Sequence, residues 1–172
     1  ALQIYLLGLM RAFEDLEREG LISRYPTFVG VQAEGCAPLV KAFESGREKY
    51  ERLDAAMTIA HAISNPAPPA GNAVLKKIRD HGGVLIGVSD KEMLGAQRAL
   101  AEAEGLFCQP ESATTVAGWK KLAAKGAVTE DDVSVLVLTG SGLKAPQVLE
   151  SQPLSVHQFA LEDLAAGLKG LT

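Results

Sequence analysis

Residues 133–144 read Val133-Ser134-Val135-Leu136-Val137-Leu138-Thr139-Gly140-Ser141-Gly142-Leu143-Lys144. A short apolar run that passes directly into glycines indicates a β-strand buried on both faces, as in a parallel sheet. In open α/β sheets, ligands bind just outside the carboxyl ends of such strands. The run therefore predicts a strand over residues 133–138 and a site residue at Thr139. The plainer alternative is that residues 139–142 form only a tight turn.

Strands and helices are predicted to alternate along the rest of the chain. Strands are expected over residues 28–32 and 84–88, with a short candidate over 106–108. Helical patterns cover residues 1–19, 35–45, 73–81, 89–105, 109–125 and 159–169. This alternation predicts an α/β fold of three αβα layers, with a mostly parallel sheet between helices. We expect a single domain over residues 1–172, with an irregular tail and a final helix over 145–172.

The first helix carries more apolar residues than one buried face needs. One stripe at helical spacing comprises Leu2, Leu6, Leu9, Phe13 and Leu16. Ile4, Leu7 and Met10 occupy the other faces, so we expect its first half to be buried all round. Native domains usually begin with a few polar, loosely held residues, whereas this chain opens inside an apolar helix without an initiator Met. We therefore expect a chain cut from a longer protein.

Composition narrows the class of protein and its partners. The 172 residues are 47% hydrophobic with a net charge of −4, which fits a globular domain and argues against a nucleic-acid partner. No apolar run approaches the ~20 residues of a membrane span, and no signal peptide is present, so we expect a cytoplasmic protein with no membrane partner. Cys36 and Cys108 lack CxxC spacing, which favours two buried thiols over a disulfide.

The sequence contains no standard catalytic motif. The patterns GxGxxG, GxxxxGK[ST], GxSxG and HExxH are all absent. His61, His81 and His157 are scattered without metal-ligand spacing, so no metal site is expected. We interpret His81 as a residue at a helix C-terminus, where the helix dipole favours it.

Two hydroxyl-rich turns are the remaining candidates for chemistry. Residues 109–115 place Glu111 and three hydroxyls at a helix N-terminus, where backbone N–H groups attract negative charge. The plainer interpretation is that Ser112 caps the helix with support from Glu111. The second turn is the one that begins at Thr139. Because both turns follow candidate strands, both could open on the same edge of the sheet, which suggests a site between them.

Four segments together resemble threonine synthases, which are pyridoxal-phosphate enzymes of the tryptophan-synthase-β fold type (fold type II). They are Gly30–Gly35, Thr58–Ala60 with Ile63–Pro66, Pro110–Ala113 and Leu138–Lys144. They occur in the family's order and rough spacing, and the resemblance covers nearly all of the chain up to Lys144. The wider fold type includes threonine dehydratases and cysteine synthases and shares a Ser or Thr at position 139. The Leu-Thr-Gly-x-Gly-Leu-Lys turn favours threonine synthase within it.

The resemblance implies conversion of O-phospho-L-homoserine and water to L-threonine and phosphate, with pyridoxal phosphate as electron sink. Thr139 would hydrogen-bond the pyridine nitrogen, and its neutral hydroxyl would not hold that nitrogen protonated. Gly140 would lie beside it in the cofactor site, Glu111 near the cofactor ring, and Ala62 and Ile63 would pass close to the cofactor. Homodimer formation and an amino-acid substrate are further implications.

Two departures from the family pattern qualify the resemblance. The family's imine-forming lysine and its glycine- and asparagine-rich phosphate loop precede the matched region, so no catalytic residue is expected in this chain. Lys144 belongs to the Thr-Gly-x-Gly-Leu-Lys turn and is not the imine lysine. The segment 62–66 is also shorter than its usual version.

Three interpretations remain open. The first is the larger, C-terminal portion of a threonine synthase, inactive without the missing N-terminal part of the same enzyme. The second is another fold-type-II enzyme, such as a dehydratase acting on serine or threonine. The third is a truncated, non-catalytic interaction module that docks through residues 1–10.

Overall fold

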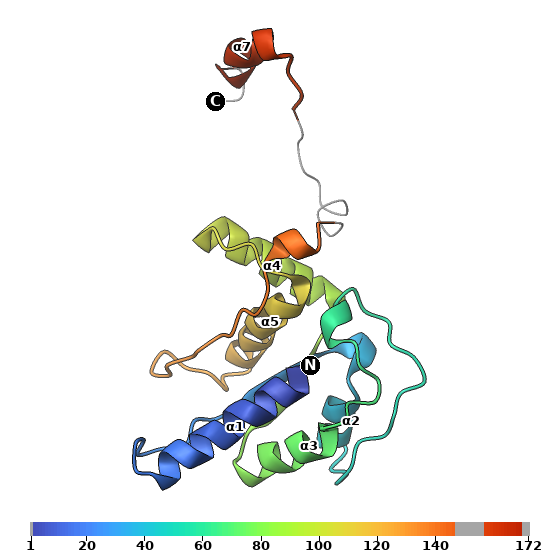
Figure 1. The fold of residues 1–172 in the computed structure, drawn as a ribbon, viewed down its shortest axis with the longest axis vertical. Helices are drawn as coiled ribbons and strands as arrows, with labels where there is room; N and C mark the ends of the chain where they lie inside the picture. The colour runs from blue at the N-terminus through green and yellow to red at the C-terminus, as the bar shows by residue number, and fades with distance from the viewer. Residues whose placement is uncertain (1, 147–156, 170–172) are drawn as a thin grey trace.

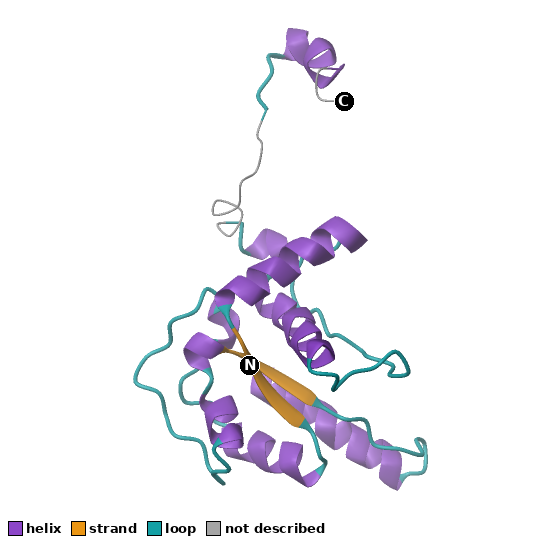
Figure 2. Cartoon of the chain, turned by 180° about the vertical axis from the view of Figure 1, so that it is seen from behind, coloured by secondary structure: helices purple, strands orange, loops and turns teal. Residues whose placement is uncertain are grey.

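The centre of the fold is a pair of parallel strands. The computed structural model describes residues 2–146 and 157–169. Strands β1 (Val29–Ala33) and β2 (Val84–Val88) pair in parallel, with Val29 opposite Val84 and Ala33 opposite Val88. Figure 2 shows these two strands side by side between the helices. The predicted strand over 84–88 is confirmed, and the one over 28–32 is displaced by one residue.

The helices also follow the predicted alternation. They are α1 (Leu2–Arg18), α2 (Pro38–Glu44), α3 (Gly71–Asp80), α4 (Asp90–Glu104), α5 (Pro110–Ala124) and α7 (Leu164–Lys169). Short 3-10 turns cover Glu34–Cys36, His61–Ile63, Gly142–Lys144 and Leu161–Asp163. The final helix is therefore shorter than predicted, and the irregular segment predicted before it lies mostly outside the described residues. No helix in the described part is both long and apolar enough to cross a membrane.

Local chemistry explains where the helices begin and end. Ser89 and Glu92 form the predicted capping box of α4, and Gly105 ends that helix in the left-handed conformation with a φ of 67°. Pro38 and Pro110 stand in the first turns of α2 and α5, where a missing N–H costs nothing.

Helices cover both faces of the sheet, because neighbouring strand residues point in opposite directions. Ile86 and Val31 contact α5 at Gly118, where a Cβ atom would meet both side chains. Leu85 instead packs with Met10 of α1 and Ile78 of α3 in a second buried cluster. The arrangement is thus α4 and α5, the sheet, then α1, α2 and α3 (Figures 1 and 2). The predicted α/β class is confirmed, with a sheet of two strands in the described residues.

The predicted strand over residues 133–138 is wrong. These residues form an irregular segment in which Val133 is 95% and Val135 83% exposed. A strand forms only where a neighbouring strand supplies backbone hydrogen bonds, and in the described residues β1 and β2 pair only with each other. The strand candidate over 106–108 is likewise reduced to an isolated antiparallel bridge between Cys108 and Ser141.

The first helix packs through one face instead of all round. Met10 is fully buried and Leu6 packs against the same cluster, whereas Ile4 is 63% exposed. Within the described part of this chain, only one face of the first half of α1 is covered, and burial of its other faces by a further segment or a partner chain stays a prediction. Since Leu6 points inward, it does not belong to an exposed docking surface.

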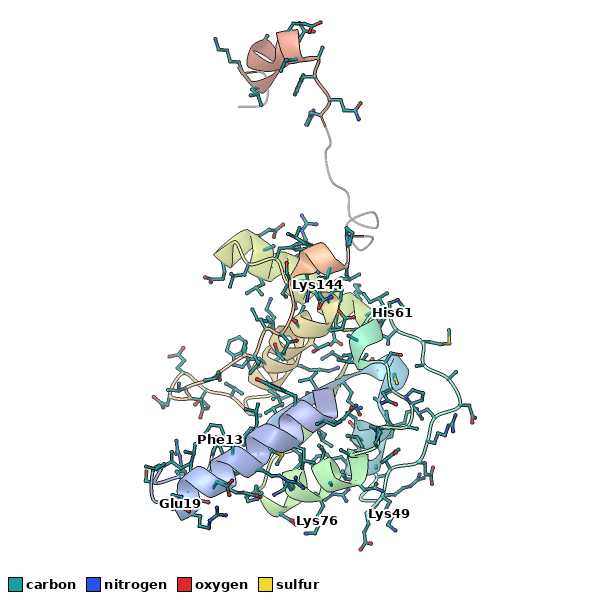
Figure 3. The ribbon with its side chains drawn as sticks, viewed as in Figure 1. Phe13, Glu19, Lys49, His61, Lys76 and Lys144 are labelled. Carbon is teal, nitrogen blue, oxygen red and sulfur yellow. The ribbon has the colours of Figure 1, made fainter. Side chains whose placement is uncertain are left out.

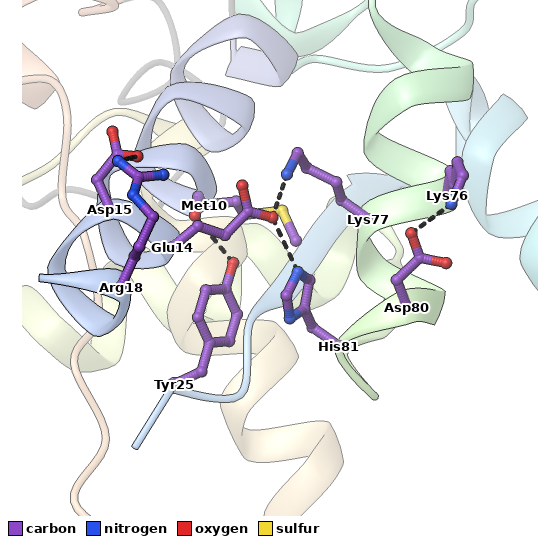
Figure 4. A network of polar contacts seen from close by, with 9 residues as sticks. All are labelled: Met10, Glu14, Asp15, Arg18, Tyr25, Lys76, Lys77, Asp80 and His81. Carbon is purple, nitrogen blue, oxygen red and sulfur yellow. Dashed lines mark hydrogen bonds and ion pairs between the residues drawn. The ribbon is translucent and has the colours of Figure 1, made fainter. Parts of the chain in front are cut away.

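A polar network fastens α1 to α3 (Figure 4). Glu14 forms an ion pair with Lys77, and Nε2 of His81 lies 2.9 Å from the same carboxylate oxygen. The Tyr25 ring stacks on His81 at 4.1 Å between centroids, and its hydroxyl donates to the carbonyl of Met10 at 3.0 Å. His81 ends α3 as predicted, but its carboxylate partner on α1 was not foreseen.

Candidate functional site

The two hydroxyl-rich turns meet around one buried serine. Ser112, on the first turn of α5, is 1% exposed. Its Oγ accepts hydrogen bonds from the backbone N–H of Thr139 at 3.1 Å and of Gly140 at 3.0 Å. The same atom lies 3.2 Å from Oγ1 of Thr139. The two turns therefore lie together, but not at a shared sheet edge as predicted, because neither follows a strand of the described sheet.

The alternative in which Ser112 caps α5 is wrong. The cap residue is Gln109, which caps through its backbone and makes no side-chain capping bond. Ser112 is the third residue of the helix, and its hydroxyl is turned toward residues 139 and 140. The alternative that residues 139–142 form only a turn is also incomplete, because that turn is bonded to α5.

Glu111 ties a third segment to the same helix. Its Oε1 accepts a hydrogen bond from the backbone N–H of Ala62 at 3.0 Å. Its Oε2 is buried and has no hydrogen-bond partner among the described residues. Ala62 is exposed, whereas the neighbouring Ile63 is buried in the cluster beneath α4 and α5. The start of α5 thus brings together Ala62, Glu111 and Thr139. Ile63 instead packs in the hydrophobic core.

Gly140 has a packing role that the sequence did not signal. A Cβ atom at this position would collide with Oε1 of Gln109. The Gly140 carbonyl accepts from the backbone N–H of Gln109 at 2.9 Å, so the two turns are held by backbone bonds as well. A larger residue at position 140 would therefore have to displace the side chain of Gln109.

A lysine at the carboxyl ends of both strands was missed by the sequence reasoning. Nζ of Lys121 donates to the carbonyl of Gly87 at 2.9 Å and lies 3.0 Å from Glu34 Oε1 and 3.3 Å from Glu92 Oε1. Burial opposes the charged ammonium, but the two carboxylates outweigh it and raise the pKa of Lys121. The partners lie on three separate segments, which leaves no local pattern to detect.

Other residues of the resembling segments have structural roles. Oε1 of Gln32 accepts from the backbone N–H of Leu39 at 2.9 Å and of Val40 at 3.0 Å, and so satisfies the start of α2. The carboxylate of Asp90 accepts from the Thr58 hydroxyl at 2.6 Å and from the Ile59 N–H at 3.1 Å. These bonds fix the approach of the chain to Ala62.

Comparison with known proteins identifies the family. The profile of the family described as Pyridoxal-phosphate dependent enzyme matches residues 4–140. The chain belongs to this family. It is also 35% identical to a threonine synthase of Methanosarcina acetivorans over 84% of its own length and 36% of that protein. A threonine synthase of Methanocaldococcus jannaschii is 36% identical over 81% of the chain and 34% of that protein.

A third relative is also a threonine synthase, and two solved structures share the fold. The threonine synthase of Mycobacterium leprae is 31% identical over 90% of the chain and 41% of its own length. The fold resembles that of a fungal L-serine ammonia-lyase from Rhizomucor miehei, with a TM-score of 0.62 and 17% sequence identity. The match covers 81% of this chain and 45% of the ammonia-lyase. Maize serine racemase gives a TM-score of 0.58 at 14% sequence identity, and the match covers 97% of this chain and 44% of the racemase. The chain spans about a third to two-fifths of the length of these curated relatives.

The gathered residues suit the ring of pyridoxal phosphate. Thr139 is exposed and carries a hydroxyl that can donate to a ring nitrogen. Oε2 of Glu111, on the residue next to Ser112, is an acceptor with no partner among the described residues. In the described part of the chain, no group of three or more His, Cys, Asp or Glu side chains is placed to hold a metal ion.

Proposed function

We propose that this chain is the C-terminal, cofactor-contacting portion of a threonine synthase, which converts O-phospho-L-homoserine and water to L-threonine and phosphate. The observation that supports it most is 30–36% identity to threonine synthases over most of the chain. The juxtaposition of Ser112 and Thr139 supports binding of the cofactor ring beside these two residues. We assign the activity to the longer protein, and we expect the isolated 172-residue chain to be inactive.

Each gathered residue has a defined task in this proposal. Pyridoxal phosphate, when bound, supplies the electron sink that the reaction needs. The Thr139 hydroxyl donates a hydrogen bond to the pyridine nitrogen, and Gly140 allows the turn to pass close to Gln109. Glu111 orients the backbone of Ala62 beside the ring, while Ile63 anchors that segment in the core. The protein works in the cytoplasm as a homodimer in this proposal.

The test compares substrates on the full-length protein that carries this sequence. We expect release of phosphate together with L-threonine from O-phospho-L-homoserine, and little 2-oxo acid from L-serine or L-threonine. Thr139→Val should lower kcat/KM by roughly tenfold or more, because a hydrogen bond to the ring is lost. Lys120→Met, an exposed change on α5, is the control. Rapid 2-oxo acid formation without phosphate release would instead favour a dehydratase.

A further inference from the structure

The turn at residues 139 and 140 takes up every hydrogen bond that the Ser112 hydroxyl can make. A serine hydroxyl offers one proton and two acceptor lone pairs. The N–H groups of Thr139 and Gly140, at 3.1 Å and 3.0 Å, occupy both lone pairs of Ser112 Oγ. A backbone N–H can only donate, so these two bonds have a fixed direction. The Ser112 proton must therefore serve a different partner.

Among the described residues, that partner is Oγ1 of Thr139 at 3.2 Å. Either hydroxyl could donate if the pair stood alone. Because the Ser112 oxygen already accepts twice, a third incoming proton from Thr139 has no lone pair to meet. The number of lone pairs therefore fixes the direction of this hydrogen bond: Ser112 donates and Thr139 accepts.

The consequence concerns the one proton left on Thr139. Because the Thr139 oxygen accepts from Ser112, its own proton is left for another partner, and Thr139 is exposed whereas Ser112 is buried. A group bound there meets a hydrogen-bond donor and must itself accept. A pyridine nitrogen accepts only in its unprotonated form.

We propose that Ser112 is a positioning residue that makes Thr139 a hydrogen-bond donor and thereby holds the pyridine nitrogen of pyridoxal phosphate unprotonated. The assignment to that ring rests on the proposed function, whereas the direction of the Ser112–Thr139 bond does not. Without Ser112, the Thr139 hydroxyl is free to rotate, and its oxygen can accept a hydrogen bond from a protonated ring nitrogen. Ser112 thus acts on the ring through Thr139 without touching it.

The first experiment is neutron diffraction from the deuterium-exchanged, cofactor-free full-length protein. We expect the Ser112 deuteron on the line to Thr139 Oγ1. A deuteron on Thr139 pointing at Ser112 Oγ would overturn the proposal. This readout needs no cofactor and no turnover, so failure of the threonine synthase assignment leaves it intact.

The second experiment measures the consequence with pyridoxal phosphate labelled with ¹⁵N in its ring. In the loaded full-length protein, Ser112→Ala should raise the protonated share of the ring nitrogen about tenfold, seen in its ¹⁵N shift across a pH series. Thr114→Val is the matched control: it removes a buried hydroxyl of the same helix that donates to the Glu111 carbonyl instead. An unchanged ring nitrogen in Ser112→Ala would refute the proposal.

A further variant guards against a folding defect in Ser112→Ala. Thr139→Val keeps both backbone bonds to Ser112 and removes the Thr139 hydroxyl, that is, its outward proton and the oxygen that accepts from Ser112. The amides of residues 139 and 140 should keep their slow hydrogen exchange while the ring nitrogen still changes as in Ser112→Ala. If Thr139→Val leaves the ¹⁵N shift of bound pyridoxal phosphate unaltered, Thr139 is not its donor and the proposal fails.

Discussion

The ammonium group of Lys121 lies 3.0 Å from Oε1 of Glu34, and this contact joins α5 to the end of β1. Lys121 also donates to the Gly87 carbonyl of β2 at 2.9 Å. One side chain therefore fastens a helix to the carboxyl ends of both strands. The helix so held is the one that presents Glu111 and Ser112 to the site.

Replacing Lys121 should weaken the attachment of α5 to the two strands and so lower the stability of the fold. We expect Lys121→Met to lower the free energy of unfolding by about 1–3 kcal/mol, because a partly buried carbonyl loses its donor and two carboxylates lose their counter-charge. Urea unfolding followed by circular dichroism measures the effect. Lys120→Met, its exposed neighbour, should change stability by less than about 0.5 kcal/mol. Equal effects of the two changes would contradict the assigned role.

The contact between α1 and α3 should depend on pH through Glu14. Its hydrogen bond from Lys77 is the main reason that the pKa of Glu14 is lowered from its usual 4.5, with His81 adding to it against the cost of burial (Figure 4). Figure 3 shows α1, with Phe13 labelled, alongside α3, with Lys76 labelled. A carboxyl whose pKa is depressed by folding stabilises the fold above pH 4.5 and loses that contribution as the pH falls through the lowered pKa.

Glu14→Gln should therefore destabilise the protein at pH 7 and have little effect in strong acid, below the lowered pKa. Urea unfolding of both proteins across this range gives the comparison. Asp15→Asn is the matched control, since Asp15 pairs with Arg18 on the exposed side of the same helix. A stability difference that stays constant from neutral to acidic pH would rule out the linkage.

Local patterns predicted the elements that depend on neighbours in sequence. The strand over 84–88 and the capping box of Ser89 and Glu92 rest on spacings of a few residues, and both are confirmed. The strand over 133–138 needed a partner strand, which no pattern within the run can supply. Apolar periodicity reports that a segment prefers burial, but it does not report what buries it.

The site shows the same division between local and distant information. The sequence located Thr139, Glu111 and Ala62, and the structure gathers them at the start of α5. It suggested a capping role for Ser112, because serine near a helix start is a strong local signal. The true partners of Ser112 lie 27 and 28 residues away, at Thr139 and Gly140, and only the folded chain reveals them.

Glu111 should control the order of the segment around Ala62. Glu111→Ala removes the acceptor of the Ala62 N–H, so amide hydrogen exchange at Ala62 should accelerate by about tenfold. Glu111→Gln keeps an oxygen in place and should leave most of that protection. Hydrogen exchange of the Ala62 amide, measured by NMR in both variants, tests this role of Glu111. Loss of protection in Glu111→Gln as well would mean that charge, and not the bond to Ala62, orders the segment.

The exposed apolar run should make the isolated 172-residue chain associate. Val133 and Val135 are 95% and 83% exposed in a segment whose backbone is not paired in a sheet, and such segments are prone to pair with other chains. We expect sedimentation velocity to show association that rises with concentration and falls in the double variant Val133→Ser, Val135→Ser. Leu143→Ser, at an exposed leucine outside the run, is the control and should leave association unchanged. If the control suppresses association as strongly as the double variant does, the run from 133 to 138 is not what drives it.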